Sequence, residues 1–105
     1  MKFSNPYWSD KLRMGSLQRW LIVQSILYYE FGTTIVTDQA WDANARQLVD
    51  MMEGRSKEEL LNTEYGYCMW DFDGSTGFHL PYALNEHDKD YLFRIANWLI
   101  GGKRP

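Results

Sequence analysis

The stretch LIVQSILYYEFGTTIVTDQAWDANARQL, residues 21–48, decides how the chain folds. Its first half is apolar at the spacing of an α-helix, and Gly32 is a typical stop for such a helix. Its second half opens another helix, because Thr37 is a good N-cap and Asp38 places a carboxylate where the helix dipole favours it. The sequence therefore predicts two helices joined by a short loop, which form a helical hairpin in the N-terminal half of the chain.

Both helices extend beyond this stretch. The first should begin near Ser9 or Ser16 and end at Phe31, and its wide apolar face favours a central position in the fold. Its periodic positions, with one polar interruption, are Leu17, Trp20, Leu21, Gln24, Leu27, Tyr28 and Phe31. The second helix should end at Gly54. Its inward positions are predicted to be Trp41, Ala45, Leu48 and Met52.

A short third helix and a β-hairpin are predicted to follow. Ser56 and Glu59 have the spacing of a capping box, which opens a helix. Residues 65–72 and 78–84 are strand-like in composition, and residues 73–77 between them are rich in turn formers. Because a lone two-stranded hairpin is only marginally stable in water, we expect it to pack against the helices.

The last predicted element is a helix that Asn85 caps and that runs through Ile100. Its inward positions are predicted to be Tyr91, Leu92, Ile95, Trp98 and Leu99. The expected fold class is therefore α+β and mainly α, with three to four helices, one antiparallel β-hairpin and a C-terminal helix. A chain of 105 residues is expected to form one domain, residues 1–105.

Composition excludes several classes of protein. A formal charge of -3 argues against direct binding of nucleic acid, which needs clustered Lys and Arg. The single cysteine, Cys68, cannot form an internal disulfide, which fits a reducing compartment. No signal peptide and no apolar run of about 20 residues is present, so we expect a cytoplasmic protein without membrane contact.

One face of the second helix carries charged groups. Asp38, Asp42 and Arg46 are spaced four residues apart and share a face, with Trp41 at its edge. One interpretation is ordinary surface chemistry, in which Asp38 interacts with the helix dipole and Asp42 pairs with Arg46.

The other interpretation is a cleft for a flat polar ligand. Tyr28 and Tyr29 lie on the opposite side of the predicted loop from these acids. Aromatic faces stack on a heterocycle, more strongly when the heterocycle is cationic, and carboxylates accept hydrogen bonds from hydroxyl and amide groups.

Residues 21–48 resemble the N-terminal helical subdomain of bacterial NAD-dependent DNA ligases, which binds the nicotinamide mononucleotide (NMN) half of NAD. That family has an aromatic residue followed by Tyr or His, a short loop, then Asp, two residues, Tyr and Asp. Here the pattern appears as Tyr28-Tyr29, the loop 30–37 and the run Asp38 to Asp42. The resemblance implies that Tyr28, Asp38 and Asp42 contact the nicotinamide, its ribose or its phosphate.

The chain also departs from the family pattern. Trp41 replaces the usual Tyr, which keeps a stacking face but lacks the hydroxyl, and Tyr29 stands where His is common. Tyr29 and Arg46 are the candidate neighbours of a phosphate. The lysine nucleophile of a ligase, in a Lys-x-Asp-Gly context, is absent from the sequence. The resemblance therefore implies binding without ligation.

We therefore expect a small non-catalytic module that binds NMN or NAD as its ligand, with no cofactor and no metal. The alternative is an acidic protein-interaction module with a larger, basic protein partner, such as a phage or mobile-element accessory protein that inhibits a host defence protein. An enzyme that acts on NAD is disfavoured, because the sequence shows no nucleophile or base near the predicted cleft.

Overall fold

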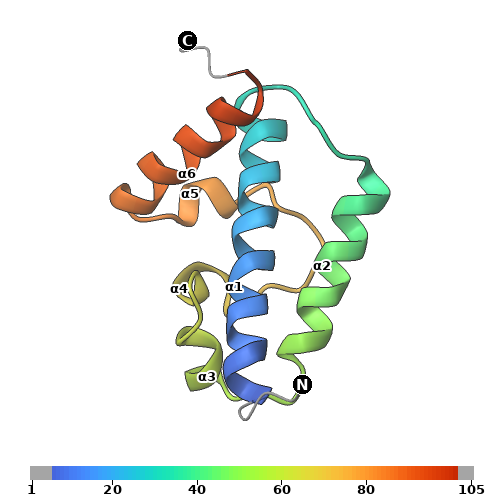
Figure 1. Cartoon of the computed structure of the whole chain (residues 1–105), viewed down its shortest axis with the longest axis vertical. Coiled ribbons are helices and arrows are strands. Elements are labelled where there is room, and N and C mark those ends of the chain that lie inside the picture. Colours follow the sequence, from blue (N-terminus) through green and yellow to red (C-terminus); the bar gives the residue numbers. More distant parts are fainter. Residues whose placement is uncertain (1–5, 102–105) are drawn as a thin grey trace.

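The computed structural model describes residues 6–101. A long central helix, α1 (Pro6–Ser25), continues into a π-helical turn, η1 (Ile26–Glu30). Helix α2 (Asp38–Met52) lies along one side of α1, and the shorter helices lie on the other side (Figure 1). These are α3 (Lys57–Leu61), α4 (Gly66–Met69), α5 (Leu80–Ala83) and α6 (Glu86–Leu99). No helix within residues 6–101 is both long and apolar enough to cross a bilayer.

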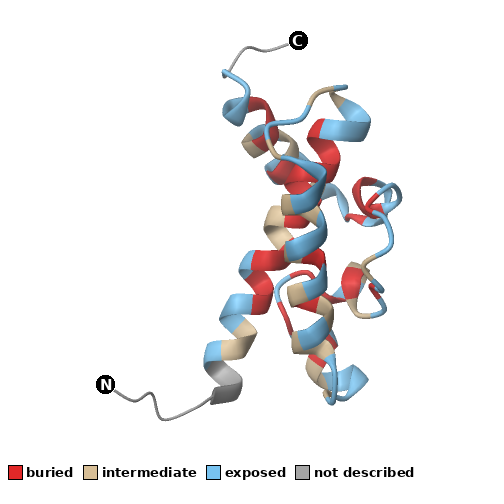
Figure 2. Cartoon of the chain, turned by 90° about the vertical axis from the view of Figure 1, so that its right-hand side faces the viewer, coloured by how far each residue is buried: buried red, intermediate tan, exposed pale blue. Residues whose placement is uncertain are grey.

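The central position predicted for the first helix is confirmed. α1 packs against α2, α5 and α6, and the buried residues gather where these helices meet (Figure 2). Met14, Leu21, Ile22, Ile26 and Leu27 are fully buried along α1 and η1. The helix begins at Pro6, earlier than the predicted Ser9 or Ser16. Proline is compatible with this start, since it is tolerated in the first turn of a helix.

The predicted helix boundaries with side-chain caps are confirmed. The Ala40 amide donates to the Thr37 hydroxyl over 3.0 Å at the start of α2. Ser56 and Glu59 form the predicted capping box at the start of α3. The Asp88 amide donates to the Asn85 side chain over 2.7 Å at the start of α6. Each cap satisfies backbone N–H groups that have no partner inside the helix.

The predicted β-hairpin is wrong. Within residues 6–101 there is no strand, and residues 65–84 form α4, an irregular segment and α5. The amides of Met69 and Trp70 donate to carbonyls four residues earlier, which is helical pairing, and Pro81 lies in the first turn of α5, where proline is tolerated. The described fold is therefore mainly α. The strand prediction failed because short apolar runs do not distinguish a strand from a buried helical turn.

The inward face predicted for the last helix is partly wrong. Leu92 and Ala96 are the buried apolar positions, and Ile95 packs beside them. Tyr91, Trp98 and Leu99 are exposed, with Trp98 leaving 72 % of its surface to solvent. Leu92 and Ala96, which are four positions apart, face the core. Tyr91 and Trp98 lie on a second apolar stripe of the helix, and this stripe faces water.

Candidate functional site

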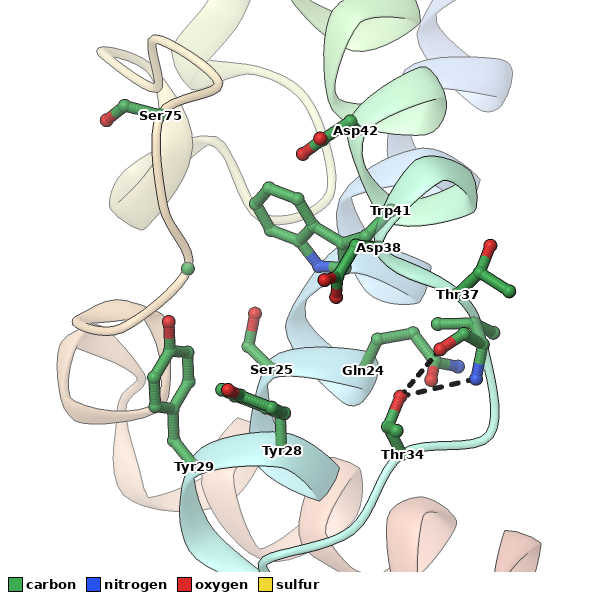
Figure 3. Close-up of a pocket in the computed structure, with 12 residues that line it drawn as sticks. Gln24, Ser25, Tyr28, Tyr29, Thr34, Thr37, Asp38, Trp41, Asp42 and Ser75 are labelled. Atoms are coloured by element: carbon green, nitrogen blue, oxygen red, sulfur yellow. Dashed lines mark hydrogen bonds between the residues drawn. The ribbon is translucent and has the colours of Figure 1, made fainter.

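A pocket of about 310 Å³ opens where η1, the start of α2 and the segment 73–77 meet (Figure 3). This volume lies at the lower end of the range of about 300–1,000 Å³ found for small-molecule sites. The lining residues are mostly polar or aromatic: Gln24, Ser25, Tyr28, Tyr29, Thr34, Val36, Thr37, Asp38, Trp41, Asp42, Ser75 and Gly77.

The π-helical turn η1 supplies the two tyrosines. The Phe31 amide donates to the Ile26 carbonyl five residues earlier, over 3.1 Å, which makes the turn wider than an α-helical one. Tyr28 and Tyr29 contact each other edge to face, with ring centroids 4.8 Å apart. Such widened turns occur frequently at functional sites, and here the turn brings two consecutive aromatic side chains to one pocket.

The first turns of α2 supply the acids and the indole. Asp38 and Asp42 are one turn apart and exposed, and in Figure 3 their carboxylates flank the Trp41 indole. Trp41 is half-buried and packs edge to face on Phe72, with ring centroids 6.3 Å apart, which fixes the indole. Within the described residues, neither carboxylate forms an ion pair, so the predicted pairing of Asp42 with Arg46 is not formed.

The segment 73–77 forms the third wall. The Ser75 amide and hydroxyl both donate to the Asp73 carboxylate, over 2.9 and 2.7 Å, and these bonds hold the pKa of Asp73 below its usual value. The hydroxyls of Tyr29 and Thr76 are 3.4 Å apart, which ties the segment to η1. Gly77 approaches so closely that a Cβ there would overlap the Ser25 hydroxyl and lie 3.0 Å from the Trp41 ring. This wall therefore depends on a glycine.

Two glutamines on α1 are buried, but their bonding differs. The Gln18 amide donates to the Thr63 hydroxyl over 2.8 Å and accepts from the Tyr65 amide over 2.9 Å. Gln24 is 6 % exposed and lines the pocket, and within the described residues its Oε1 has no hydrogen-bond partner. An unpaired buried acceptor costs about 1–3 kcal/mol, and most buried polar groups avoid it. Folding stability therefore does not explain why a glutamine occupies position 24.

We expect replacement of Gln24 by methionine to leave the free energy of unfolding unchanged or to raise it by up to about 1 kcal/mol. Methionine has a similar length and leaves no unpaired acceptor. Gln18→Met is the matched control, because it removes two hydrogen bonds and leaves the Tyr65 amide without its acceptor. The control should lose about 1–3 kcal/mol. Urea unfolding measures both changes, and an equal loss in the two variants would contradict this role for Gln24.

Five of the six residues predicted as a ligand site lie in this one pocket: Tyr28, Tyr29, Asp38, Trp41 and Asp42. Arg46 does not line it and is exposed one turn further along α2. Sequence analysis did not assign Gln24 and Ser25 to the site, although Gln24 is the polar interruption in the apolar stripe of α1. It also missed Ser75 and Gly77, which the predicted hairpin placed in a turn far from the loop after η1.

The lining residues provide hydroxyl, amide, carboxylate and aromatic groups, and they include no Cys, His or Lys. This set can bind a ligand by stacking, hydrogen bonding and charge. The residues that the structure describes contain no group of three or more His, Cys, Asp or Glu side chains placed to hold a metal ion.

Comparison of the chain with protein-family models, with curated proteins and with solved structures gave no match.

Proposed function

We propose that this chain is a non-catalytic binding module whose pocket holds the nicotinamide half of a nicotinamide nucleotide, NMN or NAD. The observation that carries the proposal is the meeting, in one pocket, of two carboxylates and three aromatic rings that come from η1 and α2. The resemblance of residues 21–48 to the NMN-binding subdomain of DNA ligases supports the same ligand.

The chemistry of nicotinamide matches these groups. Its N-substituted ring is a flat cation, which Tyr28, Tyr29 and Trp41 can stack on or surround. Asp38 and Asp42 offer four carboxylate oxygens as acceptors for ribose hydroxyls, and they balance the charge of the ring. The carboxamide carries N–H donors. The Oε1 of Gln24, which has no donor partner within the described residues, can accept from them.

Thermal melting with NMN, NAD or the nucleoside nicotinamide riboside tests this proposal. A ligand at a hundredfold excess over its dissociation constant should stabilise the folded chain by about 2.7 kcal/mol. If none of the three compounds raises the melting temperature at millimolar concentration, the pocket does not bind nicotinamide ligands.

We expect Asp38→Asn to weaken binding of the best of these ligands by roughly tenfold or more, because an exposed carboxylate next to a cation is replaced by a neutral amide. The fold should lose only about 0.5 kcal/mol, from the interaction of Asp38 with the dipole of α2. Asp50→Asn is the matched control, since Asp50 is exposed on the same helix but does not line the pocket. Calorimetric titration should show unchanged affinity for the control, and equal affinities in both variants would remove Asp38 from the site.

A second function is favoured by a row of exposed aromatic rings that continues from the pocket. Tyr29 contacts Phe78 at 5.3 Å between ring centroids, and Phe78 contacts Tyr82 at 6.0 Å. Phe78 and Tyr82 leave 56 % and 63 % of their surfaces to solvent. Rings of this kind are enriched at protein interfaces, so the alternative is a larger protein partner that places a basic side chain between Asp38 and Asp42.

The two functions separate in one comparison. Tyr82→Ala should leave the binding of nicotinamide ligands intact, because Tyr82 does not line the pocket and reaches Tyr29 only through Phe78, but it should weaken capture of a protein partner. Recovery of a specific partner by the native chain but not by this variant, together with no thermal shift by any nicotinamide ligand, would favour the interaction module.

A further inference from the structure

The charged residues that line the pocket have one sign. Of its twelve lining residues, only Asp38 and Asp42 carry charge, and both are acidic. Arg46, the residue expected to sit near a phosphate, lies outside the lining. Phosphate sites in proteins are built from Arg, Lys or converging backbone N–H groups. The described lining has no such cation. At the N-terminus of α2 the Ala40 amide donates to the Thr37 hydroxyl, and the Asp38 carboxylate adds negative charge in the first turn.

The neutral polar groups of the pocket suit a donor-rich cation. Gln24 is more than nine-tenths buried, lines the pocket and leaves Oε1 unpaired within the described residues. The terminal torsion of a glutamine has two broad wells related by half a turn, so the amide can present either its oxygen or its nitrogen to a ligand. Gln24 is thus a buried group whose amide can form a hydrogen bond with a ligand. This observation is independent of the two carboxylates.

From these observations we propose that the pocket selects the positively charged, phosphate-free form of the ligand, nicotinamide riboside, over NMN. This inference rests on the proposed function, because it concerns the same pocket and the same ring. It also differs from what the resemblance to ligases implies, in which the phosphate is part of the bound ligand.

The charge difference between the two ligands explains why nicotinamide riboside should bind more tightly than NMN. Both ligands carry the cationic ring and the ribose, and NMN adds a phosphate with about −1.5 to −2 charges at pH 7. A phosphate held within about 8 Å of either carboxylate, the screening length at physiological salt, experiences the charge of that carboxylate. The added phosphate is therefore repelled by Asp38 and Asp42, whereas the shared ring is attracted by them.

Calorimetric titration of the full chain with nicotinamide riboside, NMN and uncharged nicotinamide tests the inference. We expect nicotinamide riboside to bind at least roughly tenfold more tightly than NMN at low salt, since exposed charges interact strongly there. Nicotinamide, which lacks both the positive charge and the ribose, should bind more weakly than the riboside. Raising the salt to about 0.5 M should shrink the ratio between riboside and NMN, because repulsion between exposed charges is screened.

The double variant Asp38→Asn/Asp42→Asn keeps the shape of both side chains and should reduce the preference for the riboside to about threefold or less. Circular dichroism on the same samples verifies that it is folded, and the salt series on the native chain tests the same claim without a variant. Equal or tighter binding of NMN by the native chain would overturn the inference and leave the proposed function standing. Binding of none of the three compounds would overturn both.

Discussion

Replacement of Gly77 by alanine is expected to abolish ligand binding and to lower the free energy of unfolding by about 2 kcal/mol, within the range for overpacked sites. The added Cβ would overlap the hydroxyl of Ser25, which is buried and donates to the Leu21 carbonyl over 2.8 Å. It would also lie 3.0 Å from the Trp41 ring. Because Ser25 is fixed in α1, segment 73–77 must move away from it, and this segment is a wall of the pocket.

A loss of binding in this variant has to be separated from a general loss of stability. Gly54→Ala serves as the control, since Gly54 has a φ of 82° and nothing within 4 Å of an added Cβ. Alanine there costs about 1–2 kcal/mol from the left-handed backbone alone. Urea unfolding should show similar destabilisation of the two variants, whereas calorimetry should show binding only in Gly54→Ala. If Gly77→Ala binds the ligand normally, segment 73–77 is not a wall of the site.

The largest expected effect on the fold itself comes from Gly66→Ala, at about 3 kcal/mol or more. An added Cβ would overlap the Leu60 carbonyl and lie 2.8 Å from the Thr63 hydroxyl. That hydroxyl accepts from the buried Gln18 amide, so the steric overlap would also disturb the hydrogen bonds that join α1 to the segment between α3 and α4. A backbone atom cannot move aside as a flexible side chain can.

Gly15→Ala gives the matched control for this variant. Gly15 lies inside α1, and the nearest atoms to an added Cβ there belong to the exposed Glu64 side chain, at 3.0 Å for Oε1 and 3.2 Å for Cβ, so this side chain must shift by a few tenths of an ångström. Alanine also favours a helix over glycine, so the change in stability should stay within about 1 kcal/mol. Urea unfolding of the two variants compares them directly. A loss below about 1 kcal/mol for Gly66→Ala would show that α4 does not depend on this close approach.

The parts of the fold that sequence analysis predicted correctly depend on local chemistry. Thr37, Ser56 and Asn85 cap the helices that follow them through bonds to amides three residues ahead. Gly32 and Gly54 end helices with positive φ, a conformation that glycine adopts without strain. Each of these signals lies within a few residues of the boundary that it sets.

The incorrect predictions concern contacts between distant parts of the chain. Residues 65–72 and 78–84 are apolar enough for strands, but the first of these runs forms α4, whose Gly66 lies close against the Leu60 carbonyl, a contact that the sequence does not show. Sequence periodicity also did not show which apolar stripe of α6 faces α1, since Leu92 with Ala96, four positions apart, and Tyr91 with Trp98, seven positions apart, both fit the repeat of a helix.

The residues of the candidate site also fall into those predictable from local sequence and those that depend on contacts between distant parts of the chain. Tyr28, Asp38, Trp41 and Asp42 are close in the sequence, so the helix–loop–helix pattern was enough to place them at one cleft. Segment 73–77 reaches the pocket through contacts such as that between Tyr29 and Thr76, which are 47 positions apart. Gln24 had a signal, a polar residue within an apolar stripe, but its unpaired oxygen is visible only in the structure.

The central claim is that nicotinamide ligands bind between the tyrosines of η1 and the acids of α2. Titration of nicotinamide riboside into the isotope-labelled chain, followed by the side-chain NMR signals of Gln24 and Trp41, tests it most directly. Gln24→Met and Trp41→Phe assign these two signals. We expect both to shift with one saturable binding curve while the indole signal of the exposed Trp98 stays fixed. Unchanged Gln24 and Trp41 signals at millimolar ligand, or shifts confined to other parts of the chain, would contradict the claim.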